Sequence, residues 1–138
     1  MPGLNISECY CTNSRRAAGA LTEFYDKELK PADVTTPQYC MLINLRRLGS
    51  ANITRWAEAV GIERSTMVRN VRPLEARGLI EQTEGRGKTY TLSDKGNETV
   101  DKALILWEGA QKKIESYLGK EDADALIRVT RRFQNLSE

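Results

Sequence analysis

One segment of the chain combines basic and other hydrogen-bonding side chains and contains no acidic residue. Its sequence is RSTMVRNVR, at positions 64–72. An arginine can donate two hydrogen bonds to guanine, an asparagine can pair with adenine in the same way, and a hydroxyl group can hold a phosphate. This composition predicts contacts to double-stranded DNA, although a basic helix face is in most proteins simply a solvated surface. The segment taken alone leaves both interpretations open.

A second basic position lies further along the chain, where Arg86 stands between two glycines and Lys88 follows two residues later. We expect this stretch to be the tip of a β-hairpin. A turn accepts almost any polar residue, so the arginine can be incidental, but such a tip is also where a hairpin would reach the minor groove of DNA. Val68 and Val71 are expected to point inward. The predicted DNA-binding residues are Arg64, Ser65, Thr66, Met67, Arg69, Asn70, Arg72, Arg86 and Lys88.

The residues needed for catalysis or metal binding are scarce. The chain has no histidine and three cysteines. The commonest general base and the commonest metal ligand are therefore missing, and a four-ligand zinc site cannot be completed. We expect no catalytic residues, no metal and no cofactor, and we predict that the protein is not an enzyme.

Cys9 and Cys11 are candidate redox residues. They stand near the start of the first expected helix, close to Arg15 and Arg16. Surroundings of this kind favour the thiolate, which is the form that oxidants attack. The simpler alternative is that all the thiols, Cys40 included, are unreactive, and the sequence does not decide between the two.

Length and composition narrow the class of protein. With 138 residues, 40% of them hydrophobic and 29% charged, the chain has the size and make-up of one globular domain. No apolar run is long enough for a membrane span, and the N-terminus lacks the basic start and apolar stretch of a secretion signal, so we expect a cytoplasmic protein. The net charge is only +2, so an anionic partner must be recognised through the local placement of charge.

The apolar spacing predicts the elements that position these residues. Helices are expected at about 7–29, at 36–48 with Thr36 as the cap, from Asn52 to 60, from 63 to about 77, from Ser93 over about 25 residues, and after Gly119. Residues 79–83 and 88–92 are expected to form an antiparallel hairpin. A short helix, a tight turn at Gly61, a second helix and a hairpin follow one another in the order of a winged helix-turn-helix. The predicted fold class is therefore mainly α with a small β-hairpin wing.

The first and last helices carry apolar stripes of their own. We divide the single domain, residues 1–138, into an N-terminal dimerisation helix (1–34), a winged helix-turn-helix part (35–96) and C-terminal dimerisation helices (97–138). Self-association would bury the two stripes and give a homodimer. Packing within one chain is the alternative.

The run GIERSTMVRNVRPLEARGLI at 61–80 resembles the recognition-helix signature of MarR-family transcriptional regulators. TPQY at 36–39 is similar to that family's second-helix start, and LSDKG at 92–96 is similar to its exit from the wing. The resemblance extends over essentially the whole chain. It implies a homodimer that binds a pseudo-palindromic double-stranded DNA operator, with the first and last helices at the dimer interface. The hairpin departs from the family pattern, because family wings are commonly longer.

The resemblance also implies a way to regulate DNA binding. In that family a cleft between the dimer helices and the DNA-reading part often admits small aromatic molecules, and some members sense oxidants through an N-terminal cysteine. The candidate ligand-pocket residues here are Tyr25, Tyr39, Trp56 and Trp107, which can equally be plain core. The prediction is a repressor released by a small aromatic ligand or by cysteine oxidation. The alternative is a non-catalytic protein-interaction module built on the same scaffold.

Overall fold

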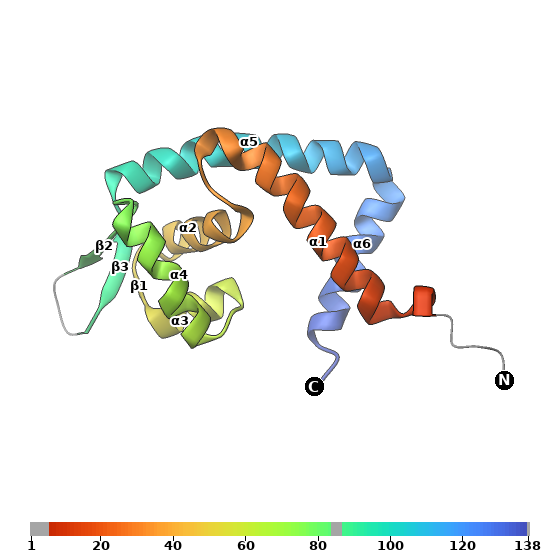
Figure 1. The fold of residues 1–138 in the computed structure, drawn as a ribbon, viewed down its shortest axis with the longest axis horizontal. Coiled ribbons are helices and arrows are strands. Elements are labelled where there is room, and N and C mark those ends of the chain that lie inside the picture. The colour runs from red at the N-terminus through yellow and green to blue at the C-terminus, as the bar shows by residue number, and fades with distance from the viewer. Residues whose placement is uncertain (1–5, 84–86, 138) are drawn as a thin grey trace.

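The computed structural model describes residues 6–83 and 87–137, and its elements follow the order expected from the sequence (Figure 1). The helices are α1 (Tyr10–Leu29), α2 (Thr36–Leu48), α3 (Ile53–Val60), α4 (Arg64–Ala76), α5 (Asp94–Leu118) and α6 (Lys120–Gln134). Short 3-10 turns lie at Ile6–Glu8 and Lys30–Ala32. The strands β1 (Ala51–Asn52), β2 (Ile80–Thr83) and β3 (Thr89–Leu92) form an antiparallel sheet in the order β1–β3–β2. The predicted fold class is confirmed, with β1 as an addition.

The long helix α5 connects two parts of the molecule. At one end α2, α3, α4 and the sheet form a compact group, which we call the module (Figure 1). At the other end lies the arm, which consists of α1, α6 and the C-terminal half of α5. With 25 residues, α5 is about 37 Å long. None of the helices in residues 6–83 and 87–137 has the length and apolar character needed to cross a membrane.

The hydrophobic core lies inside the module. Trp56 of α3 and Met67 and Leu74 of α4 have no exposed surface, and Val100 of α5 is buried in the same cluster. The indole Nε1 of Trp56 donates a 2.8 Å hydrogen bond to the carbonyl oxygen of Met41, so the polar atom of this buried ring is satisfied. This core fixes α4 relative to α3 and to the start of α5.

The start of α2 differs by one residue from the sequence prediction. Thr35 is the N-cap, because its hydroxyl accepts a hydrogen bond from the amide of Gln38 while the Gln38 side chain accepts one from the amide of Thr35. Thr36, the predicted cap, has another role. Its amide and its hydroxyl each donate a 2.7 Å hydrogen bond to Oδ1 of Asp26, which ties α2 to α1.

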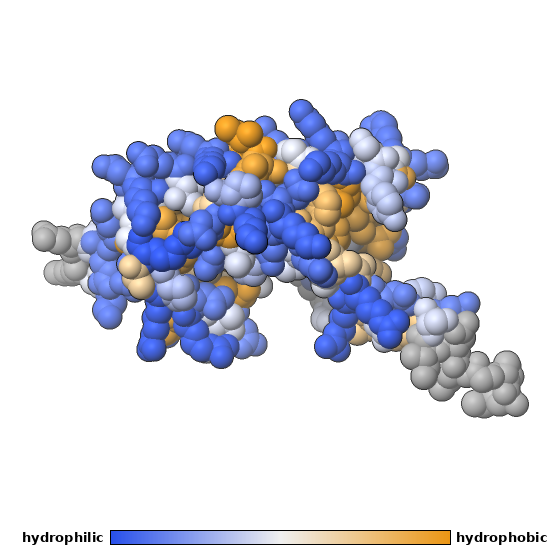
Figure 2. Space-filling model, turned by 45° about the horizontal axis from the view of Figure 1, so that its top comes forward, coloured by the Kyte–Doolittle hydropathy of each residue, from blue (hydrophilic) through white to orange (hydrophobic). Residues whose placement is uncertain are grey.

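The arm leaves large apolar side chains uncovered. No residue of α6 is buried, and Phe133 is 48% exposed. On α5, Tyr117 is 86% exposed. Hydrophobic surface gathers at the arm end of the molecule, between polar surfaces (Figure 2). In the single chain these side chains face solvent, and a further surface is needed to bury them.

Candidate nucleic-acid interface

A closed turn joins α3 to α4. The side-chain oxygen of Asn52 accepts a 2.8 Å hydrogen bond from the amide of Arg55 and so caps the start of α3. The helix ends at Gly61, whose φ of 85° lies in the left-handed region that favours glycine. The amides of Gly61 and Ile62 both donate to the carbonyl oxygen of Ala57. This turn sets the direction of α4 in the helix-turn-helix.

α4 has one buried face and one exposed face. Met67, Val71 and Leu74 are spaced four and three residues apart and are at most 2% exposed, so they hold the helix in the core. The opposite face, which we call the reading face, consists of exposed residues. They are Arg64, Ser65, Val68, Arg69 and Arg72.

Two assignments on this helix are corrected by the structure. Met67, predicted to face DNA, has no exposed surface, whereas Val68, predicted to face inward, is 37% exposed. The reason is helical phase. Val68 lies four residues from both Arg64 and Arg72 and shares their side of the helix, whereas Met67 lies four residues before the buried Val71.

The arginines of α4 differ from others in the chain in their ion pairing. A guanidinium nitrogen of Arg46 lies 2.6 Å from Asp101, and one of Arg77 lies 3.2 Å from Asp33, so these two arginines connect elements of the fold. Within residues 6–83 and 87–137, no carboxylate forms a salt bridge with an arginine of α4. The donors of those arginines remain available, and a planar guanidinium suits a phosphate or the edge of a guanine.

The other predicted DNA-binding residues lie beside the reading face or on the hairpin. Thr66 and Asn70 are half-buried at the edge of that face. Lys88 is exposed and directly precedes β3, which pairs with β2 in a register that places Thr83 opposite Thr89. Arg86 lies outside the described residues. α4 and the hairpin belong to the same end of the molecule (Figure 1).

The four aromatic residues predicted to line a ligand cleft occupy different environments. Trp56 has no exposed surface, and its ring centroid lies 5.8 Å from that of Tyr90 in the core. Tyr39 of α2 stacks on Trp107 of α5 with a centroid distance of 6.4 Å, and burial raises the pKa of Tyr39 to about 12. Tyr25 lies in the arm. The structure therefore brings Tyr39 and Trp107 together, and it places Trp56 in the core and Tyr25 in the arm.

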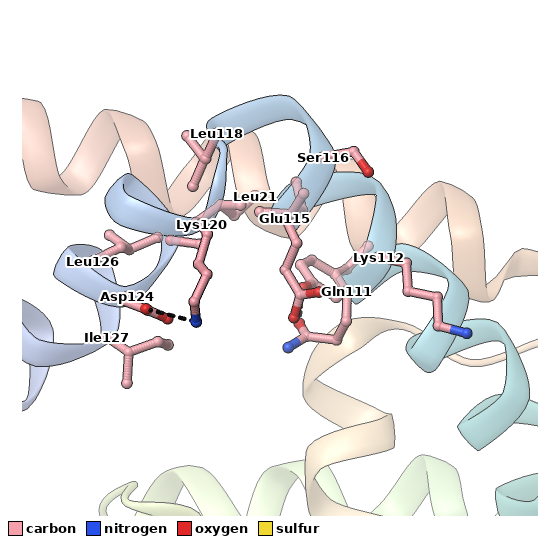
Figure 3. Close-up of a pocket in the computed structure, with 13 residues that line it drawn as sticks. Leu21, Gln111, Lys112, Glu115, Ser116, Leu118, Lys120, Asp124, Leu126 and Ile127 are labelled. Carbon is pink, nitrogen blue, oxygen red and sulfur yellow. Dashed lines mark hydrogen bonds and ion pairs between the residues drawn. The ribbon is translucent and has the colours of Figure 1, made fainter.

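A hollow of about 750 Å³ lies between α1, α5 and α6 (Figure 3). The hydroxyl of Tyr25 donates a hydrogen bond to the side-chain oxygen of Gln111 at this hollow, and burial raises the pKa of Tyr25. On the α6 side, Nζ of Lys120 lies 3.3 Å from Asp124, and Leu21 of α1 adds apolar surface. Mixed walls of this kind suit a small molecule with one apolar and one polar end. Gln111 and Lys120 could not be predicted as lining residues, because single polar residues on a helix carry no periodic signal.

The cysteines are free thiols in different surroundings. Cys9 is exposed and is the N-cap of α1, where its sulfur accepts a 3.5 Å hydrogen bond from the amide of Thr12. Hydrogen bonding to the side chain of Thr12, and to a smaller extent to its amide, lowers the pKa of the Cys9 thiol. Cys11 is exposed. Cys40 is half-buried, and burial raises its pKa.

The same arrangement of elements occurs in known proteins. The sequence model of the MarR family matches residues 34–85, which contain α2, α3, α4 and β2. The M. tuberculosis transcriptional regulator MosR is 32% identical, over 94% of this chain and 93% of that chain, with a TM-score of 0.74. The chain belongs to the MarR family.

Two further structures extend the MarR-family comparison to almost the full length. The transcriptional repressor CouR bound to p-coumaroyl-CoA is 25% identical, over 99% of each chain, with a TM-score of 0.89. CouR bound to a 23-mer DNA duplex is 27% identical, over 94% of each chain, with a TM-score of 0.86. Membership of the MarR family confirms the resemblance carried by residues 61–80, and makes this chain a transcriptional regulator rather than an enzyme.

Proposed function

We propose that this MarR-family chain is a homodimeric repressor that binds a pseudo-palindromic double-stranded DNA operator through α4. The observation that carries the proposal is the reading face, on which Arg64, Arg69 and Arg72 are exposed and have no salt bridge within the described residues. Its opposite face is locked in the core by apolar side chains. CouR, which is similar over most of this chain, has been captured on a DNA duplex, and this supports the same use of the fold here.

The reading face and its edge offer groups for both kinds of DNA contact. The guanidinium of Arg69 and the amide of Asn70 suit base edges in the major groove. Arg64 and Ser65 begin the helix and suit phosphates. Val68 lies between these residues, and its methyl groups suit the methyl of a thymine. The rest of the proposed interface is Thr66, Arg72, Arg86 and Lys88.

The uncovered arm supports the homodimer. Next to the hollow, a groove between α1, α5 and α6 is lined almost entirely by apolar side chains, including Phe24, Tyr117 and Leu126. α6 adds exposed apolar residues such as Phe133. A second copy would bury both sets of side chains through one two-fold interface. The two α4 helices would then read half-sites about one DNA turn, roughly 34 Å, apart.

Two signals are proposed to release the operator. The first is a small aromatic ligand, and the Tyr25–Gln111 pair supports it because a phenol and an amide can bind the polar end of such a molecule. CouR bound to p-coumaroyl-CoA supports small-molecule binding by this fold. The second signal is oxidation, which is supported by the exposed thiols of Cys9 and Cys11 and by the lowered pKa of Cys9. Release by peroxide that persists after both cysteines are replaced by serine would exclude the thiol signal.

The experiment that tests the proposal starts from DNA fragments of the source genome selected on the purified protein. The affinity for a selected fragment is then measured over a series of salt concentrations for the wild type, Arg72→Ala and Lys102→Ala. Lys102 is an exposed α5 residue, so its replacement removes one charge away from the reading face. We expect the affinity of the wild type to fall steeply as the salt concentration rises. Arg72→Ala should lose much more affinity than Lys102→Ala. A protein that binds no fragment even at low salt would refute DNA binding and favour the protein-interaction module.

A further inference from the structure

The C-terminal end of α4 is held by the first turn of α5. Nζ of Lys95 donates a 2.8 Å hydrogen bond to the carbonyl oxygen of Arg77. The hydroxyl of Ser93 donates a 2.5 Å hydrogen bond to the carbonyl oxygen of Gly78, and the amide of Ser93 donates one of 3.0 Å to that of Leu79. Three consecutive carbonyl groups that follow α4 are thus bonded by two residues at the start of α5. These carbonyl groups lie in the short segment between α4, which ends at Ala76, and β2, which begins at Ile80.

Gly96 brings the two backbones even closer. A Cβ atom at this position would lie 2.0 Å from the carbonyl oxygen of Leu79 and 3.0 Å from its carbonyl carbon. The amide of Gly96 also donates a 3.0 Å hydrogen bond to the buried hydroxyl of Ser93. Backbone atoms and one short side chain make most of this contact, so it has little freedom to adjust. We call it the α4–α5 junction, and its residues are Arg77, Gly78, Leu79, Ser93, Lys95 and Gly96.

A second attachment at the same place contributes less. The guanidinium of Arg77 lies 3.2 Å from Asp33, but the Asp33 side chain is 93% exposed. Exposed ion pairs stabilise a structure weakly because water and salt screen them. The hydrogen bonds from α5 are therefore the main polar attachment at the C-terminal end of α4, in addition to the core that holds its buried face.

We infer that Ser93, Lys95 and Gly96 are positioning residues for DNA recognition, because they fix the angle of α4 to α5. The inference rests on the proposed function. With 13 residues, α4 is about 19 Å long, so a tilt of about 10° at the junction moves its N-terminal end by about 3 Å. A displacement of this size is as long as a hydrogen bond, and it removes the contacts of the reading face with base edges.

The same helix also connects the reading face to the arm. α5 begins at the junction, and near its other end Gln111 and Glu115 line the hollow (Figure 3). A change in the direction of α5 that starts in the arm is therefore transmitted to α4 without a flexible connection between them. The junction is the point at which that change alters DNA binding.

The test compares Lys95→Met with Lys102→Met. Both replacements keep a long side chain and remove one positive charge from α5, but only Lys95 donates to the junction. Affinities are measured by fluorescence anisotropy for a selected operator and for a scrambled duplex over a salt series, together with thermal unfolding. We expect Lys95→Met to lower operator affinity about five- to tenfold more than Lys102→Met does, with equal effects on the scrambled duplex and unchanged salt slopes. Lys95→Arg keeps a hydrogen-bond donor at this position, so its operator affinity should be close to that of the wild type.

Two outcomes would overturn the inference. Equal operator affinities for Lys95→Met and Lys102→Met would show that the hydrogen bond to Arg77 does not position α4. A parallel loss on both duplexes, with a salt slope reduced by about one, would make Lys95 a phosphate contact. Failure of the wild type to bind any duplex would instead refute the proposed function, so the two failures are distinguishable.

Discussion

Replacing Gly96 by alanine tests the close contact between α5 and the start of β2 most directly. The added methyl group would lie 2.0 Å from the carbonyl oxygen of Leu79, so one backbone must move by about 1 Å. Overpacking of a filled site costs about 1–3 kcal/mol. The movement also strains the 3.0 Å hydrogen bond from the Ser93 amide to the same oxygen, which is worth about 1 kcal/mol. Alanine is better than glycine inside a helix by about 0.5–1 kcal/mol, and this offsets part of the loss.

The expected result is a loss of about 2 kcal/mol in the free energy of unfolding, or about 6–10 °C in Tm for a chain of this size. Urea denaturation followed by circular dichroism measures it, at one protein concentration because association also contributes. Gly109→Ala is the matched control, since Gly109 lies in the same helix and its added methyl group would meet no atom within 4 Å. The control should gain about 0.5–1 kcal/mol. If Gly96→Ala is as stable as Gly109→Ala, the close approach of the two backbones is refuted.

Three other predictions concern the reading face, the core and the thiols. Arg69→Ala should weaken operator binding by about 1–3 kcal/mol and relax sequence preference, as measured by titration with operator variants; unaltered preference would remove Arg69 from base recognition. Burial raises the pKa of Tyr39 to about 12, so between about pH 10 and 12 the unfolded chain loses this proton first and stability falls as pH rises. In urea denaturation, the free energy of unfolding of Tyr39→Phe should fall less steeply with rising pH than that of the wild type. Equal slopes for the two proteins would contradict the raised pKa of Tyr39. Iodoacetamide at neutral pH should modify Cys9 before Cys40, because the pKa of the first thiol is lowered and that of the second is raised; peptide mapping that finds the reverse order would contradict this.

Features that depend on a few neighbouring residues could be predicted from the sequence. Asn52 and Ser93 cap their helices as expected, because each side-chain oxygen accepts from an amide three residues ahead. Gly61 ends α3 in the left-handed conformation for an equally local reason. At 35–36 the local signal is ambiguous, because either threonine can cap a helix. Asp26, ten residues earlier in the chain, binds Thr36 and leaves the cap to Thr35.

Features that depend on distant residues were not predictable in this way. Val71 and Leu74 form an apolar helical face equally well with Met67 or with Val68, so the spacing does not decide between them. Only the core around α4 buries Met67 and leaves Val68 exposed. The two-residue strand β1 exists because Ala51 pairs with Tyr90, far along the chain. The junction between α4 and α5 likewise joins residues that no local pattern connects.

The two tryptophans of the chain lie in different environments, so their fluorescence reports on two different parts of the protein. Trp56 is fully buried and hydrogen-bonded in the module, so its emission should change when the module opens. Trp107 is half-buried on α5 and stacks on Tyr39 of α2, so its emission should respond when α5 moves relative to α2. A variant that keeps only Trp107 would therefore follow a movement of α5 without an attached dye. Unfolding of the module is followed through Trp56 and reorientation of α5 through Trp107, each in an unlabelled variant that keeps one of the two tryptophans.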